Sequence, residues 1–465
     1  MLFNSVEFLI FFAVVYGLYL VLPRRGQNLL ILLASYLFYG WWDWKFLGLI
    51  WLSTTVDYFV AQGMDDAQTP QKKQRILYIS LAFNLGLLAT FKYAGFFARS
   101  FMDAFAALGY SVDLRFAELV LPVGISFYTF QSLSYTVDVY RGKLKAARDP
   151  LDFAMFVAFF PQLVAGPIER GAHFMPQVQA PRTVTFDHWR EGAWLILFGY
   201  FKKVVLADNM TPFTTRLFDN PAQVHGLEVL IGIYAFAFQI YGDFSGYSDI
   251  ARGTAKLMGF DLLYNFKMPY FAINPSDFWR RWHISLSSWL RDYLYITLGG
   301  NRRGGWFTYR NLMITMVLGG LWHGASYNFV AWGIFHGAIL CIHRWLTHGR
   351  EASEGSRWWA LKVVAFFQVT CVGWLLFGVK HLGDAWVLLH NIVSPFEVNG
   401  LVSLISLVTF ATPVMLLDWL QLRNEDMLVM RRYAAPVRFG VYVATFAAVL
   451  LAGSTGAKQF IYFQF

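Results

Sequence analysis

Three histidines lie in a stretch of the sequence that contains no Asp, Glu, Lys or Arg. The stretch runs for 33 residues from Asn311 to His343 and also contains His323 and His336. Ionisable groups in such apolar surroundings are costly to bury and usually serve a function. A neutral imidazole takes up a proton near neutral pH and acts as a general base on a neighbouring hydroxyl. His336 and His343 are seven residues apart, so they share one helix face, and we interpret them as structural.

His323 is the strongest candidate for chemistry because the backbone around it is easily broken. The charge-free stretch is longer than one straight membrane span, and Gly319, Gly320 and Gly324 flank the histidine in the sequence Gly-Gly-Leu-Trp-His-Gly. Irregular backbone at bilayer depth is tolerated only where it is buried in protein or lines a cavity. We therefore predict that His323 faces a cavity at a helix break. The alternative is a core histidine that is hydrogen-bonded between helices.

A second group of polar residues recurs at helical spacing after Asn274. Asn274 precedes a proline, so this residue or Ser276 is suited to cap a helix. The residues that follow predict one helix with an apolar stripe and a polar stripe. The apolar stripe comprises Phe278, Trp282, Leu286, Trp289 and Tyr293, and the polar stripe comprises Arg280, His283, Ser287 and Arg291.

This predicted helix has two interpretations. It is either an interfacial amphipathic helix with aromatic anchors and arginines that reach to the headgroups, or part of a reaction centre that contains His283. From Lys256 to Arg310 there are eight Lys or Arg and three Asp. This excess of positive charge suits both a cytoplasmic loop and recognition of a phosphate-bearing donor, and the sequence does not separate the two.

The elements that must position these residues are membrane helices. Of the 465 residues, 57% are hydrophobic and only 14% are charged, whereas soluble domains are about 25% charged. Charge-free stretches long enough to span a bilayer recur along the chain. We predict an all-α polytopic membrane protein with about eleven or twelve transmembrane or re-entrant helices, and we expect residues 1–465 to form one membrane-embedded domain.

The distribution of positive charge predicts the direction of insertion. The loops at 23–27, 63–75 and 141–149 hold nine Lys or Arg, while the loop at 99–118 holds two. By the positive-inside rule the N-terminus lies outside the cytoplasm. The net charge of +9 is then mainly a topology signal, and we expect no nucleic-acid partner because the basic residues are scattered between apolar spans.

These residues resemble the membrane-bound O-acyltransferase family, and within it the bacterial branch of alginate O-acetyltransferase membrane subunits. The resemblance extends over nearly the whole chain. It rests on the motifs Leu121–Gln131, Phe160–Arg170, Gly242–Gly259, the Phe-Trp-Arg-Arg-Trp-His sequence that ends at His283, Gly299–Arg302, Gly319–Gly324 and the closing Phe460–Phe465.

The resemblance implies a fold, an activity and a set of site residues. The fold would be a ring of helices around a central funnel, and His323 would match the family's catalytic histidine. His283 would match a second polar position, at which the family accepts other polar residues. The donor would be a cytoplasmic thioester, acetyl-CoA, that brings an acetyl group to a hydroxyl for O-acetylation of an exopolysaccharide such as alginate.

The resemblance also implies a location and partners. The location would be the bacterial inner membrane, with contacts to membrane lipids, and a separate periplasmic polysaccharide acetyltransferase would complete the transfer. No permanently bound cofactor or metal is expected, and no cofactor-binding residues are assigned. Two other functions stay open at this point: D-alanyl transfer to teichoic acids from a carrier-protein donor, and passive transport of a glycan intermediate.

Overall fold

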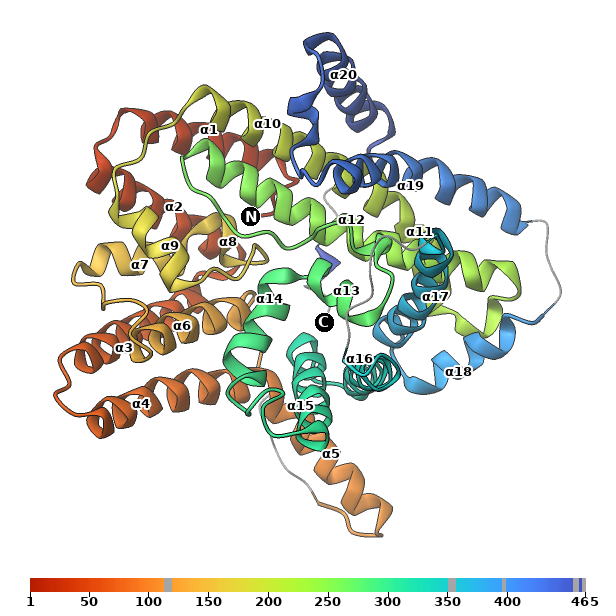
Figure 1. The fold of residues 1–465 in the computed structure, drawn as a ribbon, viewed down its shortest axis with the longest axis horizontal. Coiled ribbons are helices and arrows are strands. Elements are labelled where there is room, and N and C mark those ends of the chain that lie inside the picture. The colour runs from red at the N-terminus through yellow and green to blue at the C-terminus, as the bar shows by residue number, and fades with distance from the viewer. Residues whose placement is uncertain (113–118, 350–356, 395–398, 455–459, 462–465) are drawn as a thin grey trace. The chain divides into compact units, whose positions relative to one another are not determined.

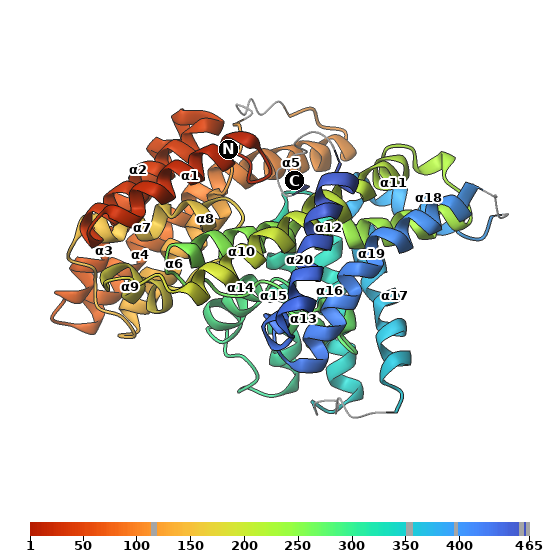
Figure 2. The ribbon, with the colours of Figure 1, turned by 90° about the horizontal axis from the view of Figure 1, so that it is seen from above.

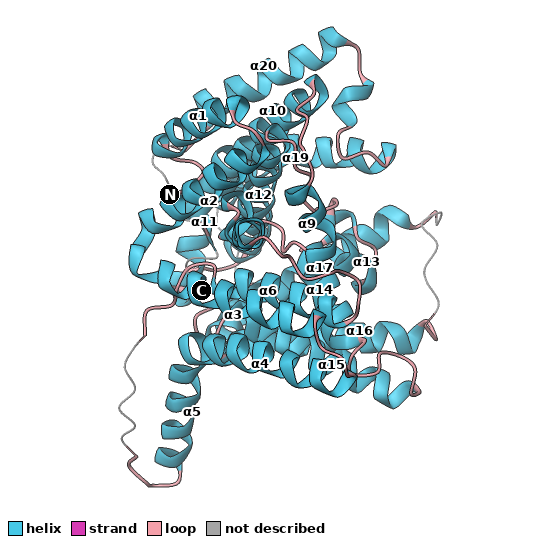
Figure 3. Ribbon diagram, turned by 90° about the vertical axis from the view of Figure 1, so that its left-hand side faces the viewer, coloured by secondary structure: helices cyan, strands magenta, loops and turns pink. Residues whose placement is uncertain are grey.

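The computed structural model is helical throughout the part of the chain that it describes, residues 1–112, 119–349, 357–394, 399–454 and 460–461, and contains no strand there (Figure 3). Residues 462–465 of the closing motif therefore lie outside the described residues. Six described helices are long and apolar enough to cross a membrane, and Val6–Val21 is a shorter apolar helix. The all-α polytopic fold class is confirmed, and the count of eleven or twelve segments stays a prediction.

Two compact units make up the chain. Unit 1 comprises residues 1–192 and 254–263, and unit 2 comprises residues 193–253 and 264–465. Two helices contribute residues to both units, namely α10 (Phe186–Tyr200) and α12 (Leu227–Leu257).

Unit 1 is built from the first nine helices. Helices α1 and α2 lie side by side (Figures 1 and 2), and α3, α4 and α6 pack against one another. The helices are α1 (Val6–Val21), α2 (Arg24–Asp43), α3 (Leu47–Asp65), α4 (Pro70–Leu88), α5 (Ala94–Ala107), α6 (Ile125–Tyr140), α7 (Pro150–Ala158), α8 (Phe160–Leu163) and α9 (Gly171–Gln179).

Local sequence signals explain where several of these helices begin. The Ser5 hydroxyl accepts the Phe8 N–H, and the Thr69 hydroxyl accepts the Lys72 N–H, so each side chain satisfies an amide that the first helical turn leaves unpaired. At Thr69 and Asp149 the next residue is proline, which suits the first helical position because it has no N–H to satisfy. The starts of α1, α4 and α7 therefore follow from capping residues in the sequence.

Unit 2 contains the later helices and the histidines. Helices α15 and α16 form an antiparallel hairpin (Figure 1), in which Cys341 Sγ near the end of α16 lies 3.7 Å from the Tyr309 carbonyl oxygen near the start of α15. The helices are α11 (Asp208–Asp219), α13 (Pro275–Arg281), α14 (Ile284–Trp289), α15 (Gly305–His323), α16 (Tyr327–Leu346), α17 (Trp359–Gly378), α18 (Leu382–Asn391), α19 (Asn399–Asn424) and α20 (Ala435–Ala452).

Short π- and 3-10-helices interrupt or extend these elements. A π-helix leaves some backbone groups out of the regular α-helical pattern and is frequent at functional sites. The π-helices are η2 (Ala89–Tyr93), η3 (Phe201–Ala207) and η6 (Leu290–Tyr295), and the 3-10 helices are η1 (Trp44–Phe46), η4 (Pro221–Gln223), η5 (Pro269–Phe271) and η7 (Val429–Arg432).

Candidate active site

His323 is the last residue of α15, at the helix break that the glycines predict. Gly324 follows in an extended conformation with φ −163° and ψ 152°, and α16 begins three residues later at Tyr327. The predicted break between Asn311 and His343 is therefore confirmed. The His323 side chain is buried, with 5% of the residue exposed.

Glycines allow α15 and α16 to pack closely against each other beside His323. A Cβ atom on Gly320 would lie 2.2 Å from the Phe329 carbonyl oxygen, and one on Gly333 would lie 2.5 Å from the Met316 carbonyl oxygen. Real Cβ atoms do not approach other atoms so closely, so only glycine permits this helix spacing. The glycines noted as helix breakers thus also serve as contact points within the hairpin.

His283 lies between two short helices. The prediction that Asn274 caps a helix is confirmed, because its Oδ1 accepts the Asp277 N–H at 2.8 Å. The prediction of one continuous helix through His283 is wrong. Helix α13 ends at Arg281, and His283 has a left-handed backbone with φ 41° before α14 starts at Ile284.

Bonds to a neighbouring loop explain this break. The Ile284 N–H donates to the Asn265 carbonyl at 2.8 Å, and the Ser285 hydroxyl donates to Asn265 Oδ1 at 2.6 Å. The Lys267 N–H donates to the Arg281 carbonyl at 3.0 Å. Backbone groups that a continuous helix would pair internally are paired with the loop instead, and His283 turns into the interior with no exposed surface.

The break also separates the members of the predicted polar stripe. Arg280 and Arg291 are exposed, Ser287 is half-buried and His283 is fully buried, so the four residues do not share one face. The predicted apolar stripe is buried over most of its length. Its buried members are Phe278, Trp282, Leu286 and Trp289, and Tyr293 is half-buried.

The structure brings His283 and His323 together. Their ring centroids are 6.3 Å apart with an interplanar angle of 50°, and the Trp322 ring lies 5.7 Å from the first and 5.1 Å from the second. Both histidines belong to unit 2. Residues that are forty positions apart in the sequence thus form one pair of imidazoles.

Aromatic rings enclose the His323 side of this pair. Trp332 on α16 meets the His323 ring edge-on at 5.1 Å, and Phe377 on α17 does so at 5.2 Å. Both residues are at most 1% exposed. The sequence pattern does not indicate either residue as part of the site. The one available signal is that Trp332 precedes His336 by one helical turn, and in the structure these two rings are 4.6 Å apart. His336 is packed among aromatic rings, and His343 lies in the last turn of α16.

The enclosure determines what the pair can do chemically. A wall of buried aromatic rings excludes water and protects a reactive acyl group from hydrolysis. Among the described residues, no group of three or more His, Cys, Asp or Glu side chains is arranged to hold a metal ion. The arrangement suits general acid–base chemistry by imidazole on an uncharged substrate group.

Two carboxylates of the Gly242–Gly259 motif lie in a place that differs in part from the one expected. The sequence predicts that Asp243 and Asp249 lie at the end of a span, where they pack at the helix end, line a cavity or pair with Arg252. They lie instead in the middle of α12, where Asp243 pairs with Lys203 at 2.7 Å and Asp249 pairs with Lys202 at 2.7 Å. Arg252 also forms an ion pair with Asp249, at 3.7 Å, so the predicted pairing with Arg252 is confirmed for Asp249. The two adjacent lysines of η3 lie inside an otherwise apolar run, and this interruption is the signal that could have identified them.

Comparison with known proteins identifies the group to which this site belongs. The family model described as membrane-bound O-acyltransferase matches residues 29–383, which include both histidines. The chain is 43% identical over 388 residues to the probable alginate O-acetylase AlgI of Azotobacter vinelandii, with 83% of this chain and 77% of the relative covered.

More distant relatives are also acyltransferases. A peptidoglycan O-acetyltransferase of Helicobacter pylori is 34% identical over 94% of this chain and 86% of its own length. A teichoic acid D-alanyltransferase of Bacillus subtilis is 27% identical over 56% of this chain and 70% of its own length. The family model covers more than half of the chain, and the chain belongs to the membrane-bound O-acyltransferase family of multi-pass membrane enzymes.

Proposed function

We propose that this chain transfers an acetyl group from cytoplasmic acetyl-CoA to a hydroxyl acceptor, for O-acetylation of an exopolysaccharide such as alginate. The observation that carries the proposal is the buried pair of His323 and His283 within an aromatic wall. The names of the most similar relatives favour acetyl transfer and alginate. The location that fits is the bacterial inner membrane, with a periplasmic polysaccharide acetyltransferase as partner.

In the proposed reaction His323 acts as the general base. Its imidazole takes the proton from the acceptor hydroxyl while the hydroxyl oxygen attacks the thioester carbonyl carbon. The carbon–sulfur bond then breaks, the thiolate leaves with the electron pair, and the imidazolium returns its proton to the thiolate. His283 orients the donor or the acceptor beside His323.

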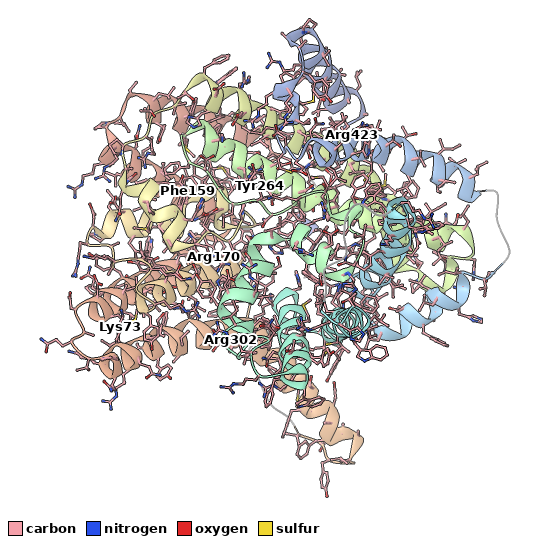
Figure 4. All side chains as sticks on the ribbon, in the orientation of Figure 1. Lys73, Phe159, Arg170, Tyr264, Arg302 and Arg423 are labelled. Atoms are coloured by element: carbon pink, nitrogen blue, oxygen red, sulfur yellow. The ribbon has the colours of Figure 1, made fainter. Side chains whose placement is uncertain are left out.

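Four arginines of unit 2 support a phosphate-bearing donor. Arg302, Arg303, Arg310 and Arg344 form no ion pair with any carboxylate in the described part of the chain. Arg302 (Figure 4) lies in the loop before α15, and Arg344 lies in the last turn of α16. At a rise of 1.5 Å per residue, Arg310 is about 20 Å along α15 from His323, so an extended pantetheine arm would connect the two sites.

A donor assay tests this part of the proposal. In detergent-solubilised protein, replacing Arg302 and Arg303 by Ala should raise the KM for acetyl-CoA about tenfold, which corresponds to about 1.4 kcal/mol. The KM for S-acetylpantetheine, which has no phosphates, should stay unchanged. Arg438→Ala serves as the control, because Arg438 is a half-buried cation at the start of α20 and is not one of these four arginines. Equal KM changes for both donors would contradict the proposed phosphate site.

A cellular assay separates acetyl transfer from the other two functions. In a host that makes the polymer, loss of His323 should abolish the acetyl content of the exported glycan and leave its amount unchanged. A loss of polymer export would favour transport. Turnover only with an aminoacylated carrier protein, and none with acetyl-CoA, would favour D-alanyl transfer, which is the activity named for the Bacillus subtilis relative.

A further inference from the structure

A buried ion triad in unit 2 is left unexplained by the histidine pair. Lys203 Nζ lies 2.9 Å from Asp208 Oδ1 and 2.7 Å from Asp243 Oδ1. The three side chains are only 7%, 3% and 4% exposed. Taking three charges out of water is costly, and a hydrophobic replacement often stabilises a protein as well as a buried ion pair does. The triad therefore calls for a role beyond stability.

The triad holds a segment from the far end of the chain. The Ile461 N–H donates to Asp243 Oδ2 at 2.6 Å, across 218 residues of sequence. Phe460 and Ile461 are 2% and 4% exposed, so this terminal segment is inserted into the interior of unit 2. A backbone N–H bound to a carboxylate forms a charge-assisted bond, which is stronger than a bond between neutral groups. Lys203 supplies a cation beside the Asp243 carboxylate.

The inserted segment leads directly to His283 through aromatic contacts. The Phe460 ring lies 4.9 Å from Tyr247 and 5.7 Å from Phe244, two residues of α12 that are one turn apart. The Phe244 ring in turn meets His283 edge-on at 4.6 Å and 82°. Aromatic pairs in this geometry prefer defined orientations, so the placement of Phe460 restricts that of Phe244, and Phe244 restricts the imidazole of His283.

The π-helix η3, which contains Lys203, also holds the end of α20. The Ser454 N–H donates to the Val204 carbonyl at 3.0 Å, and Asn209 Nδ2 donates to the Ala452 carbonyl at 2.9 Å. Thus η3 and the first turn of α11, which contains Asn209, bind residues 452–454 directly, and Asp243 binds Ile461. The described residues before 455 and after 459 are therefore both bound close to Lys203: Ser454 binds the next residue, Val204, and Ile461 binds Asp243, the ion-pair partner of Lys203.

We propose that Asp243 and Lys203 are positioning residues that hold Phe460 and Ile461 against Phe244 and thereby fix the orientation of His283. The role assigned to His283 rests on the proposed function, whereas the attachment of the terminal segment does not. The side chains of Asp243 and Lys203 touch neither substrate nor His323 in this scheme and act through the terminal segment.

The test compares two carboxylates on the same helix. Asp243→Ala removes the acceptor of the Ile461 N–H, and Asp249→Ala is the matched control, because Asp249 also pairs with a lysine of η3 but forms no hydrogen bond with Phe460 or Ile461, the described residues of the terminal segment. A second variant, Asp243→Leu, fills the space of the carboxylate with an apolar group, and both variants keep the buried ion pair of Lys203 with Asp208.

Three readouts decide the outcome. The first is the rate at which a carboxypeptidase releases the C-terminal residues from solubilised protein. The second is the rate at which diethyl pyrocarbonate modifies His283, followed by mass spectrometry. The third is the split between kcat and donor KM. We expect both Asp243 variants to raise the first two rates at least tenfold and to lower kcat about tenfold with little change in KM, and we expect Asp249→Ala to do none of these.

Each contrary result has a definite meaning. An unchanged rate of C-terminal release in both Asp243 variants would overturn the attachment. Faster release with an unchanged His283 modification rate would overturn the link to the histidine. Wild-type protein that does not turn over acetyl-CoA would overturn the proposed function, while the first two readouts would still decide the positioning role.

Discussion

At the scale of single residues, His283 combines a polar ring with a backbone that few residues adopt. Its φ of 41° lies in the left-handed region, which costs most residues about 1–2 kcal/mol and is easier for Asn. Asn also keeps a donor and an acceptor in its side chain. The position therefore selects residues on two grounds, backbone conformation and polarity.

Substitutions at His283 should separate these two requirements. We expect His283→Asn to keep a melting temperature close to that of the wild type and to retain acyl transfer within about tenfold, because Asn tolerates the left-handed backbone and keeps a polar side chain. His283→Ala should be less stable by about 1 kcal/mol or more and should lose most of its activity. Thermal unfolding and turnover of the two purified variants check this. An Ala variant as active as the Asn variant would show that polarity at this position is unimportant.

The contact between Glu169 and His173 should make the stability of unit 1 depend on pH. His173 Nδ1 lies 2.8 Å from Glu169 Oε2, and this hydrogen bond raises the pKa of His173 above its ordinary value of 6.5. Burial raises the pKa of Glu169. Both groups bind protons more tightly in the folded state, so both contribute stability at low pH that is lost as pH rises.

The melting temperature of the solubilised protein should therefore fall as pH rises from about 6 to about 8.5, the range in which histidine titrates. Because the His173 side chain is 39% exposed, the contribution is less than about 1 kcal/mol. His173→Asn keeps a polar contact but does not titrate, so its melting temperature should change less over the same range. A variant with the same pH dependence as the wild type would contradict this assignment.

At the scale of elements, the α15–α16 hairpin is the part that the sequence predicts best. A charge-free stretch too long for one span, with glycines near its middle, indicates two helices and a break. The structure has that break directly after His323. The sequence could not show that Gly320 and Gly333 also fix the spacing of the two helices, because this depends on which faces meet.

Gly320→Ala should disturb this hairpin and displace His323. The added Cβ would meet the Phe329 carbonyl oxygen at 2.2 Å, so α15 and α16 must separate, at a cost of about 1–3 kcal/mol. A displacement of about 1 Å at a reacting group can lower the rate about 100-fold. We therefore expect a strong loss of acyl transfer together with a lower melting temperature.

Gly86→Ala provides the control for this experiment. Gly86 lies inside helix α4 and has no atom within 4 Å of an added Cβ. Alanine at such a position should leave stability unchanged or raise it by up to about 1 kcal/mol. If Gly320→Ala were as stable and active as Gly86→Ala, the close packing of α15 on α16 would not determine the position of His323.

The segment Asn274–Tyr293 shows where local sequence reasoning fails. Its helical periodicity is real, and the apolar residues of α13 and α14 are buried as expected. The break at His283 is not visible in that periodicity because it depends on bonds to Asn265, eighteen residues earlier in the chain. Tertiary partners of this kind override a local pattern, and here they decide whether the second histidine reaches the first.

At the scale of the whole molecule, the low content of charged residues predicts a membrane protein and also indicates which polar residues are candidates for function. With 14% charged residues, each buried polar group stands out, and His323 was identified in this way. The same reasoning placed Asp243 and Asp249 at the end of a span, because the sequence does not show that Lys202 and Lys203 balance them inside the protein. Composition and periodicity do not predict which buried charges pair across helices.

The role of His323 as the general base is the central claim, and one measurement tests it most directly. The measurement is the rate of acetyl transfer from acetyl-CoA by purified His323→Ala, with the melting temperature as a check on folding and His343→Ala as the control. Loss of a general base lowers rates about 10²- to 10⁴-fold. We expect a loss in that range for His323→Ala, with the donor KM within about twofold, and near-normal turnover for His343→Ala. A folded His323→Ala variant that transfers acetyl groups at the wild-type rate would contradict the claim.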